Sequence, residues 1–218
     1  MSPDTVHDPE ILDEASEGKE AQLVRSDETL PPQLTLLPLS NRPLFPGLVV
    51  PLIYEGEEMG KIVRDLAASH EQHVGLVLVR DEDEPYAPEN LYEVGVVARV
   101  AKAVEIEGHG LHLVVECLRR FRIEGFLSNE NPIRVLASYR SETSFEDNIT
   151  LRAYTVAIVN TIKELLKHNP LYEEELRLFA SRFDVNEPTR LADFAASLTT
   201  ASRQDLQDIL ETDAIFER

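Results

Sequence analysis

The sequence contains one cysteine and no tryptophan in 218 residues, and its 21 Lys and Arg residues are outnumbered by 40 Asp and Glu residues. The single cysteine, Cys117, excludes an internal disulfide framework and any metal site built from several cysteines. No apolar run reaches the roughly 20 residues that a membrane-spanning helix needs. The N-terminal residues are too acidic for a transit peptide, and they lack the basic and apolar stretches of a secretory signal. We therefore expect a cytoplasmic protein with no membrane contact.

The formal net charge is −19, of which −7 falls on residues 1–33 and −12 on the remainder. Such acidity repels phosphate backbones, so it argues against nucleic acid as a partner. The one local basic run is Arg-Arg-Phe-Arg at residues 119–122. We expect these arginines to pair with carboxylates of the same chain rather than with an acidic peptide or a neighbouring subunit.

The composition changes at about residue 34 and again at about residue 144, which predicts three parts. Residues 1–33 are rich in Asp, Glu, Ser and Pro without a periodic apolar pattern, which is typical of a disordered acidic tail. Residues 34–143 have the alternating pattern of strands, and residues 144–218 have the period of helices. With 43% hydrophobic residues, a chain of this length can bury a core. The predicted class is α+β.

Residues 34–143 predict about six strands with one inserted helix, which is expected at residues 57–69 from the spacing of its apolar residues. The clearest hairpin lies at residues 94–115, where apolar residues alternate on both sides of the turn Glu-Gly-His-Gly. Separate strands are expected to follow at residues 121–126 and 133–139. Because bending such a set into a closed or nearly closed barrel leaves few exposed edges, we expect a bent β-barrel.

The last part of the chain predicts a helical bundle. Residues 151–166 place apolar side chains on one helical face, a second helix is expected at residues 171–182, and a third begins near residue 186 with a proline in its first turn. Residues 202–205 have the spacing of a capping box and predict the start of a fourth helix. Residues 213–218 look like the start of a fifth. Since that helix would stop after barely more than one turn, we expect the natural chain to continue.

The stretch LPLSNRPLFPGLVVPL at residues 37–52 is apolar enough to be buried, yet four prolines and one glycine interrupt it. Proline cannot donate to a sheet ladder, so this stretch predicts an irregular, bent strand pair. Apolar side chains that the core leaves uncovered here would suit unfolded, apolar polypeptide, although core packing is the more common fate of such residues. The candidate substrate-binding residues are Leu44, Phe45, Pro46, Leu48 and Tyr54.

No other pattern predicts a catalytic, cofactor or metal site. His70 and His73 have a spacing that can bind a metal, but structural zinc needs four ligands and the sequence places no others. Cys117 has no base beside it in the sequence, so a small buried hydrophobic side chain is the preferred interpretation. The acidic run at residues 81–84 lacks the spacing and the glycine of an EF-hand, and we interpret it as a solvated loop.

Four blocks of the sequence resemble the N-terminal domain of Lon proteases, and together they span nearly everything after the tail. The first is the stretch at residues 37–52. The second, LYEVGVVA at residues 91–98, is similar to the family's YEVGTVA strand. The third, LVVECLRRFRI at residues 113–123, is similar to VLVEGLxRxRI, with Cys117 in place of the usual glycine. The fourth, PTRLAD at residues 188–193, matches PxxLAD. Four blocks in the right order are a specific signal.

The resemblance implies a PUA-like bent β-barrel followed by a helical bundle, and a role in protein quality control. A domain of this family would recognise unfolded or damaged protein substrates and support assembly of a ring, expected to be a hexamer. The parent protein would be an ATP-dependent serine endopeptidase with an ATPase module and a Ser–Lys protease module. This sequence has no Gly-x-x-x-x-Gly-Lys-Ser/Thr loop and no Ser–Lys motif. We therefore expect the chain itself to be inert as a protease and as an ATPase.

Two other functions stay open at this point. One is a stand-alone adaptor or ligand-binding protein with a Lon-like domain and no protease module, which the sequence beyond residue 218 would decide. The other is RNA binding, because PUA-like barrels bind RNA elsewhere. The acidic charge of the folded part argues against RNA, and an analogy of fold alone is weak support.

Overall fold

The computed structural model describes residues 30–54, 57–68, 72–106, 110–139, 149–167 and 188–218. Most of the predicted tail, the predicted helix at residues 171–182, and His70 lie outside the described residues. In the described part, no helix is both long and apolar enough to cross a membrane. The elements in chain order are β1 (Gln33–Leu39), β2 (Val49–Tyr54), α1 (Glu57–Ala68), β3 (His73–Leu78), the short 3-10 helix η1 (Pro88–Asn90), β4 (Val94–Ile106), β5 (Gly110–Ser128), β6 (Arg134–Ser138), α2 (Ile149–Lys167), α4 (Pro188–Leu198) and α5 (Arg203–Glu211).

The strands form one bent, mixed sheet in the order β2-β5-β4-β3-β1-β6, in which only β1 and β3 run parallel. The 19-residue strand β5 pairs with β2 and β4, and near its end also with β6. Its register shifts between Cys117 and Arg119, opposite Ala98 and Val97 of β4, and between Ile123 and Gly125, opposite β6. Such bulges bend a strand and increase its twist. The long strand therefore curves the sheet, and the pairings lead from β5 through β4, β3, β1 and β6 back to β5.

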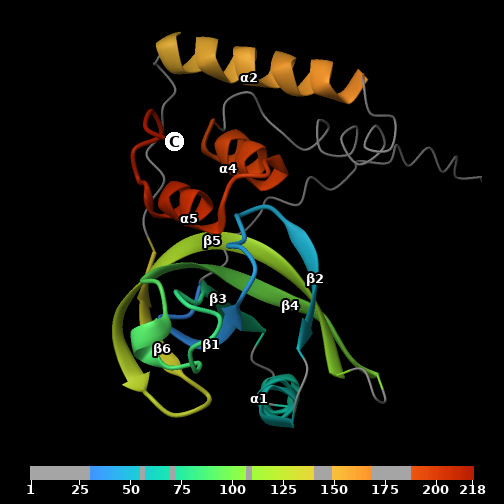
Figure 1. Ribbon diagram of the computed structural model, residues 1–218, viewed down its shortest axis with the longest axis vertical. Coiled ribbons are helices and arrows are strands. Elements are labelled where there is room, and N and C mark those ends of the chain that lie inside the picture. Colours follow the sequence, from blue (N-terminus) through green and yellow to red (C-terminus); the bar gives the residue numbers. More distant parts are fainter. Residues whose placement is uncertain (1–29, 55–56, 69–71, 107–109, 140–148, 168–187) are drawn as a thin grey trace, which may run out of the picture.

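The helices are stacked on one side of the sheet in the order α5, α4, α2, while α1 lies near the opposite end (Figure 1). Side chains of α1, α4 and α5 join those of the strands in a single buried cluster. The largest fully buried side chains are Phe45, Phe121, Leu34, Leu36, Leu37, Leu76, Leu78, Leu113, Ile133, Leu206 and Gln207. The core is therefore a product of the sheet together with the helices that cover it.

The prolines of β1 and β2 lie at strand edges. The Cys117 N–H donates to the Leu48 carbonyl oxygen over 2.8 Å, so the even-numbered residues of β2 turn their peptide groups toward β5. The nitrogen of Pro51 therefore points away from β5. No hydrogen bond of the β2–β5 ladder is lost there, although proline lacks an N–H. Pro38 pairs with Val77 of β3, beyond the short stretch of β1 that pairs with β6. The predicted strand pair is wrong, however, because β1 pairs with β3 and β6 whereas β2 pairs with β5.

Most predicted elements are confirmed, including six strands, the inserted helix, and helices that begin at Pro188 and just after Ser202. The Asp205 N–H donates to Ser202 Oγ over 3.2 Å, as the capping spacing predicted. Two further expectations are wrong. Residues 111–126 belong to one continuous strand, and residues 213–218 form a turn rather than the start of a helix. The six predicted strands form one mixed sheet rather than a closed barrel. PUA-like topology and a helical bundle stay predictions.

Candidate functional site

The predicted binding residues divide into a buried group and a half-buried group. Phe45 is 0% exposed, Pro46 is buried, and the ring of Tyr54 is buried with its hydroxyl donating to the Pro38 carbonyl oxygen over 3.1 Å. Burial raises the pKa of the Tyr54 hydroxyl well above its usual value of 10. These three side chains are part of the core, which is the fate that the sequence favoured for this segment.

Leu44 and Leu48 are half-buried and pack against the edge of the same core. The loop between them is fixed to β5 through its backbone. The Gly47 N–H donates to the Cys117 carbonyl oxygen over 2.8 Å, and the Cys117 N–H donates back to Leu48. Gly47 has φ +86°, a conformation that glycine adopts readily and other residues rarely do. Of the predicted residues, only Leu44 and Leu48 therefore present apolar surface to solvent.

Strand β2 carries a row of exposed apolar side chains that the sequence analysis did not single out. Val49 is 56% exposed, Ile53 is 57% exposed, and Pro51 between them is also exposed. Because side chains of a strand alternate between two faces, these three residues point to one side while Val50, Leu52 and Tyr54 point to the core side. The signal was available in the sequence: apolar residues occupy both faces of a strand whose proline marks an edge.

The exposed row continues across the two neighbouring strands. Cross-strand register aligns Val49 with Glu116 and Arg99, Pro51 with Val114 and Lys102, and Ile53 with His112 and Val104. Directly opposed side chains on one face of a sheet are in contact range. We call this surface the outer face; its members are Val49, Pro51, Ile53, His112, Val114, Glu116, Arg99, Lys102 and Val104.

The polar members of the outer face lean toward positive charge. Arg99 forms an ion pair with Glu116, and both side chains remain partly exposed. Lys102 is exposed in the middle row, next to Val114. The whole chain has a net charge of −19, whereas the outer face carries two cationic side chains, Arg99 and Lys102, against one carboxylate, Glu116. This surface is therefore less acidic than the rest of the chain. The outer face can accept an apolar segment, and its charge is compatible with an acidic flank on that segment.

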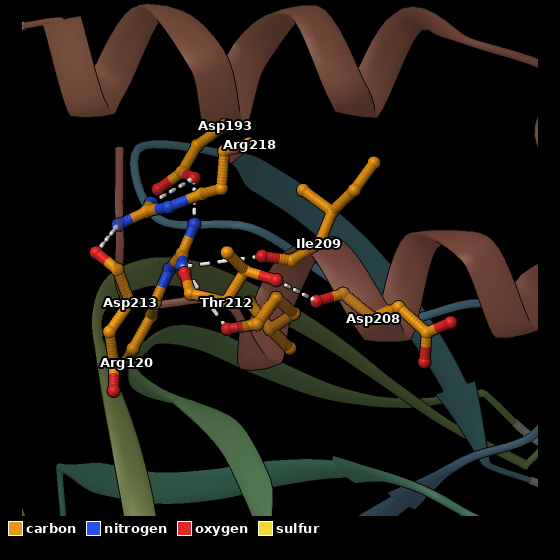
Figure 2. Close-up of polar contacts among 8 residues, drawn as sticks. Arg120, Asp193, Asp208, Ile209, Thr212, Asp213 and Arg218 are labelled. Atoms are coloured by element: carbon orange, nitrogen blue, oxygen red, sulfur yellow. Dashed lines mark hydrogen bonds and ion pairs between the residues drawn. The ribbon is translucent and has the colours of Figure 1, made fainter. Parts of the chain in front are cut away.

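Charged side chains hold the junction between the sheet and the C-terminal helices (Figure 2). Arg120 of β5 donates to the carbonyl oxygens of Leu210 and Thr212 over 3.1 and 3.2 Å, at the C-terminal end of α5. The last carbonyls of a helix lack intrahelical donors and carry partial negative charge, so a guanidinium there is favourable. Arg120 also donates to Asp193 Oδ1 of α4, which binds the sheet to a second helix.

The other predicted chemistry has a structural explanation. Arg122 pairs with Glu93 over 2.9 Å, so both Arg120 and Arg122 contact carboxylates of this chain, as expected. Cys117 is a buried free thiol, and burial, with a smaller effect of nearby Glu116, raises its pKa to about 12. A thiol in that state is a poor nucleophile, which fits the predicted hydrophobic role. Within the described segments, no cluster of three or more His, Cys, Asp or Glu is arranged to bind a metal.

Comparisons with known proteins agree with the resemblance seen in the four blocks. A family model described as the ATP-dependent protease La (LON) substrate-binding domain matches residues 33–218. Lon protease 1 of Syntrophotalea carbinolica is 40% identical over 205 residues, which are 94% of this chain and 25% of that protein. Lon protease of Chlamydia trachomatis is 38% identical over 221 residues, covering 100% of this chain and 26% of that protein. The chain thus spans about a quarter of the length of these relatives.

Solved structures extend the likeness to the fold. The N-terminal domain of Mycobacterium avium complex Lon protease matches with a TM-score of 0.63 at 21% identity, over 85% of this chain and 92% of that one. The Lon N-terminal domain protein from Xanthomonas campestris matches with a TM-score of 0.58 at 17% identity, over 84% and 92% of the two chains. Because the family model matches residues 33–218, which include nearly all of the described residues, this chain belongs to the family of Lon substrate-binding domains.

Proposed function

We propose that this chain is the part of an ATP-dependent Lon protease that recognises unfolded or damaged proteins, and that the outer face is where they bind. The observation that carries the proposal is the exposed row of Val49, Pro51 and Ile53 on a rigid, paired strand. Folded proteins bury most of their apolar residues, whereas unfolded chains expose them. A surface that binds any apolar segment can therefore distinguish unfolded from folded proteins without specificity for a particular sequence.

Binding at one copy of the outer face would be weak. Full burial of a valine or isoleucine side chain contributes about 1.5–3 kcal/mol, and these side chains are already partly covered. Association and ordering of a flexible segment offset much of that gain. We propose that the domain also supports assembly of a ring, expected to have six subunits, in which several weak contacts with one client raise the effective concentration.

The five residues predicted from sequence enter this proposal in two roles. Leu44 and Leu48 extend the apolar surface next to β2, because both lie just before this strand and are half-buried. Phe45, Pro46 and Tyr54 anchor the loop and β2 to the core, which keeps the outer face rigid. A rigid surface loses less conformational entropy when it binds.

The remaining parts of the proposal concern the whole protein. We propose that the chain is non-catalytic, that it belongs to an ATP-dependent serine endopeptidase, and that it acts in the cytoplasm. Relatives named Lon protease, of which this chain spans about a quarter, support that reading. We also propose a PUA-like sheet with its helices forming a bundle. The pairing of β5 with both β4 and β6 and the stacking of α2 on α4 support it.

The test compares binding of one client in two states. The probe is α-lactalbumin, either native or reduced and carboxymethylated so that it stays unfolded, with affinity measured by calorimetry. We expect binding of the unfolded form only, and a loss of roughly tenfold or more in affinity for the double variant V49D/I53D, since tenfold corresponds to about 1.4 kcal/mol.

The matched control is the double variant F126D/L127D, which places the same two charges at other exposed apolar residues of the sheet. Circular dichroism confirms that each variant is folded. Unchanged affinity in a folded V49D/I53D variant would exclude the outer face as the binding site. Equal binding of native and unfolded α-lactalbumin would exclude recognition of unfolded chains altogether.

A further inference from the structure

One buried carboxylate connects three parts of this molecule. Asp193 lies on α4 and is 0% exposed. Arg120 of β5 donates to its Oδ1 atom, and Arg218 donates to the same oxygen over 3.2 Å. Arg218 also donates to the Asp213 carbonyl oxygen over 3.2 Å, which folds the C-terminal segment back on itself. In Figure 2 the two guanidinium groups converge on Asp193 from the sheet and from the chain end.

Helix α5 is attached to the sheet by contacts that do not involve Asp193. Gln207 is fully buried and donates to the Val94 carbonyl oxygen over 3.0 Å. Tyr92 donates to Gln204 Oε1 over 2.5 Å, and Arg203 donates to the Val79 carbonyl oxygen. Leu206 and Leu210 of α5 belong to the buried cluster of the sheet. The sheet and α5 therefore form one platform.

Helix α4 contacts that platform along α5 and through the loop after β1. Arg42, from the loop after β1, donates to the Ser197 carbonyl oxygen over 3.1 Å at the end of α4. Among the α4 side chains, Ala196 joins the buried cluster of the sheet, and Leu191 is buried outside it. Helix α2 packs against α4, so it follows the position that α4 takes. The ion pair from Asp193 to Arg120 adds a direct charged connection between β5 and α4.

We propose that Asp193 acts as a latch: its carboxylate holds α4, with α2 packed on it, and the C-terminal segment 213–218 against the platform formed by the sheet and α5. When the charge of Asp193 is lost, α4 and α2 move relative to the sheet while α5 stays in place. Two blocks of the sequence, at residues 113–123 and 188–193, supply the two sides of this latch. The inference does not depend on where a client binds.

The physical basis is the cost of leaving charge buried without its partner. A buried ion pair contributes little net stability, but removal of one member strongly destabilises the arrangement that buries the other. Without the carboxylate, the guanidinium groups of Arg120 and Arg218, which are 14% and 6% exposed, must reach water. Arg120 can keep its hydrogen bonds to the end of α5, so separation of α4 is the movement that hydrates these groups.

Distances between spin labels test the latch in the whole chain. One pair joins the exposed positions Gln33→Cys on β1 and Ala153→Cys on α2, and a second pair joins Gln33→Cys and Asp208→Cys on α5. The native Cys117 is buried and does not compete for the label. In Asp193→Asn we expect the sheet–α2 distance distribution to broaden or shift, and the sheet–α5 distribution to remain as in the unmutated chain.

The matched control is Glu93→Gln, which removes a carboxylate from the exposed pair with Arg122 on the same sheet and should leave both distributions unchanged. Arg218→Gln serves as a milder variant, because it removes one arginine partner of Asp193 and leaves Arg120 in place. It should broaden the sheet–α2 distribution less. Unchanged sheet–α2 distances in Asp193→Asn would overturn the proposal. So would equal broadening of both label pairs in either variant, since that result would mean general loosening.

Discussion

Phe121 of β5 lies directly opposite Gly95 of β4, and its ring covers the space that a side chain at position 95 would fill. A Cβ atom at Gly95 would lie 3.1 Å from Phe121 Cε1 and only 2.4 Å from the Leu76 carbonyl oxygen. A Cβ atom at Gly75 of β3 would lie 2.9 Å from Phe121 Cζ of the same ring. The absence of two side chains thus creates the room for one large aromatic ring, which is 2% exposed in the centre of the core.

This packing predicts that Gly95→Ala destabilises the protein. The added methyl group meets backbone as well as an aromatic ring, so neighbours cannot move aside at low cost, and overpacking of this kind costs about 1–3 kcal/mol or more. The free energy of unfolding, measured in urea by circular dichroism, should fall by at least that amount. Gly125→Ala is the matched control, because a Cβ atom there has no neighbour within 4 Å, and its stability should be unchanged or slightly higher.

Gly47 predicts a loss of stability for a different reason. Its φ of +86° is strained for any residue with a side chain, although a Cβ atom at this position meets nothing within 4 Å. We expect Gly47→Ala to lower the free energy of unfolding by about 1–2 kcal/mol, and Gly47→Asn to lower it less, because Asn tolerates positive φ better. If both variants unfold at the same urea concentration as the original chain, backbone strain at position 47 is not a determinant of stability.

The sequence predicted the elements better than it predicted the contacts between them. Alternation and capping patterns identify strands and helix starts from neighbouring residues alone, and Ser202 is an example. The bulges along β5 shift the alternation, which made one strand look like two. The partner of Arg120 is 73 residues away, so the sequence could predict an ion pair but could not name Asp193. The outer face likewise requires the register of three strands, which no local pattern contains.

Two buried tyrosines predict how stability depends on alkaline pH. Tyr54 and Tyr86 donate to the carbonyl oxygens of Pro38 and Leu36 in β1, and burial raises the pKa of both hydroxyls above 10, with an added effect of Tyr54 on Tyr86. As pH rises above 10, these tyrosines lose their protons in the unfolded chain but keep them in the folded one. The folded state then binds more protons, so stability falls with increasing pH.

We expect the variant Y54F/Y86F to be less stable than the original chain at pH 7, by about 1 kcal/mol for each hydrogen bond lost. Between pH 10 and 11 the stability of the variant should decline less steeply, by about 1 kcal/mol for each tyrosine removed. Urea titrations at pH 7, 10 and 11 measure both effects. Tyr154→Phe, at an exposed position of α2, is the control and should be neutral at pH 7. Parallel pH profiles for Y54F/Y86F and the original chain would contradict the assignment.

Gln207 predicts the strength of the attachment between α5 and the sheet. Its side chain is fully buried, and its Nε2 atom donates to the Val94 carbonyl oxygen over 3.0 Å and to Glu211 Oε1 over 2.9 Å. Gln207→Met keeps the length of the side chain but leaves a buried carbonyl without this donor, which costs about 1–3 kcal/mol. Gln204→Met is the control, because it removes an exposed hydrogen-bond acceptor from the same helix and should cost about 1 kcal/mol or less.

Hydrogen exchange should locate the loss of protection of Gln207→Met in α5 and the adjoining part of β4. If Gln207→Met is as stable as the original chain, the buried amide contributes only packing volume, and the apolar residues Leu206 and Leu210 hold α5 on the sheet.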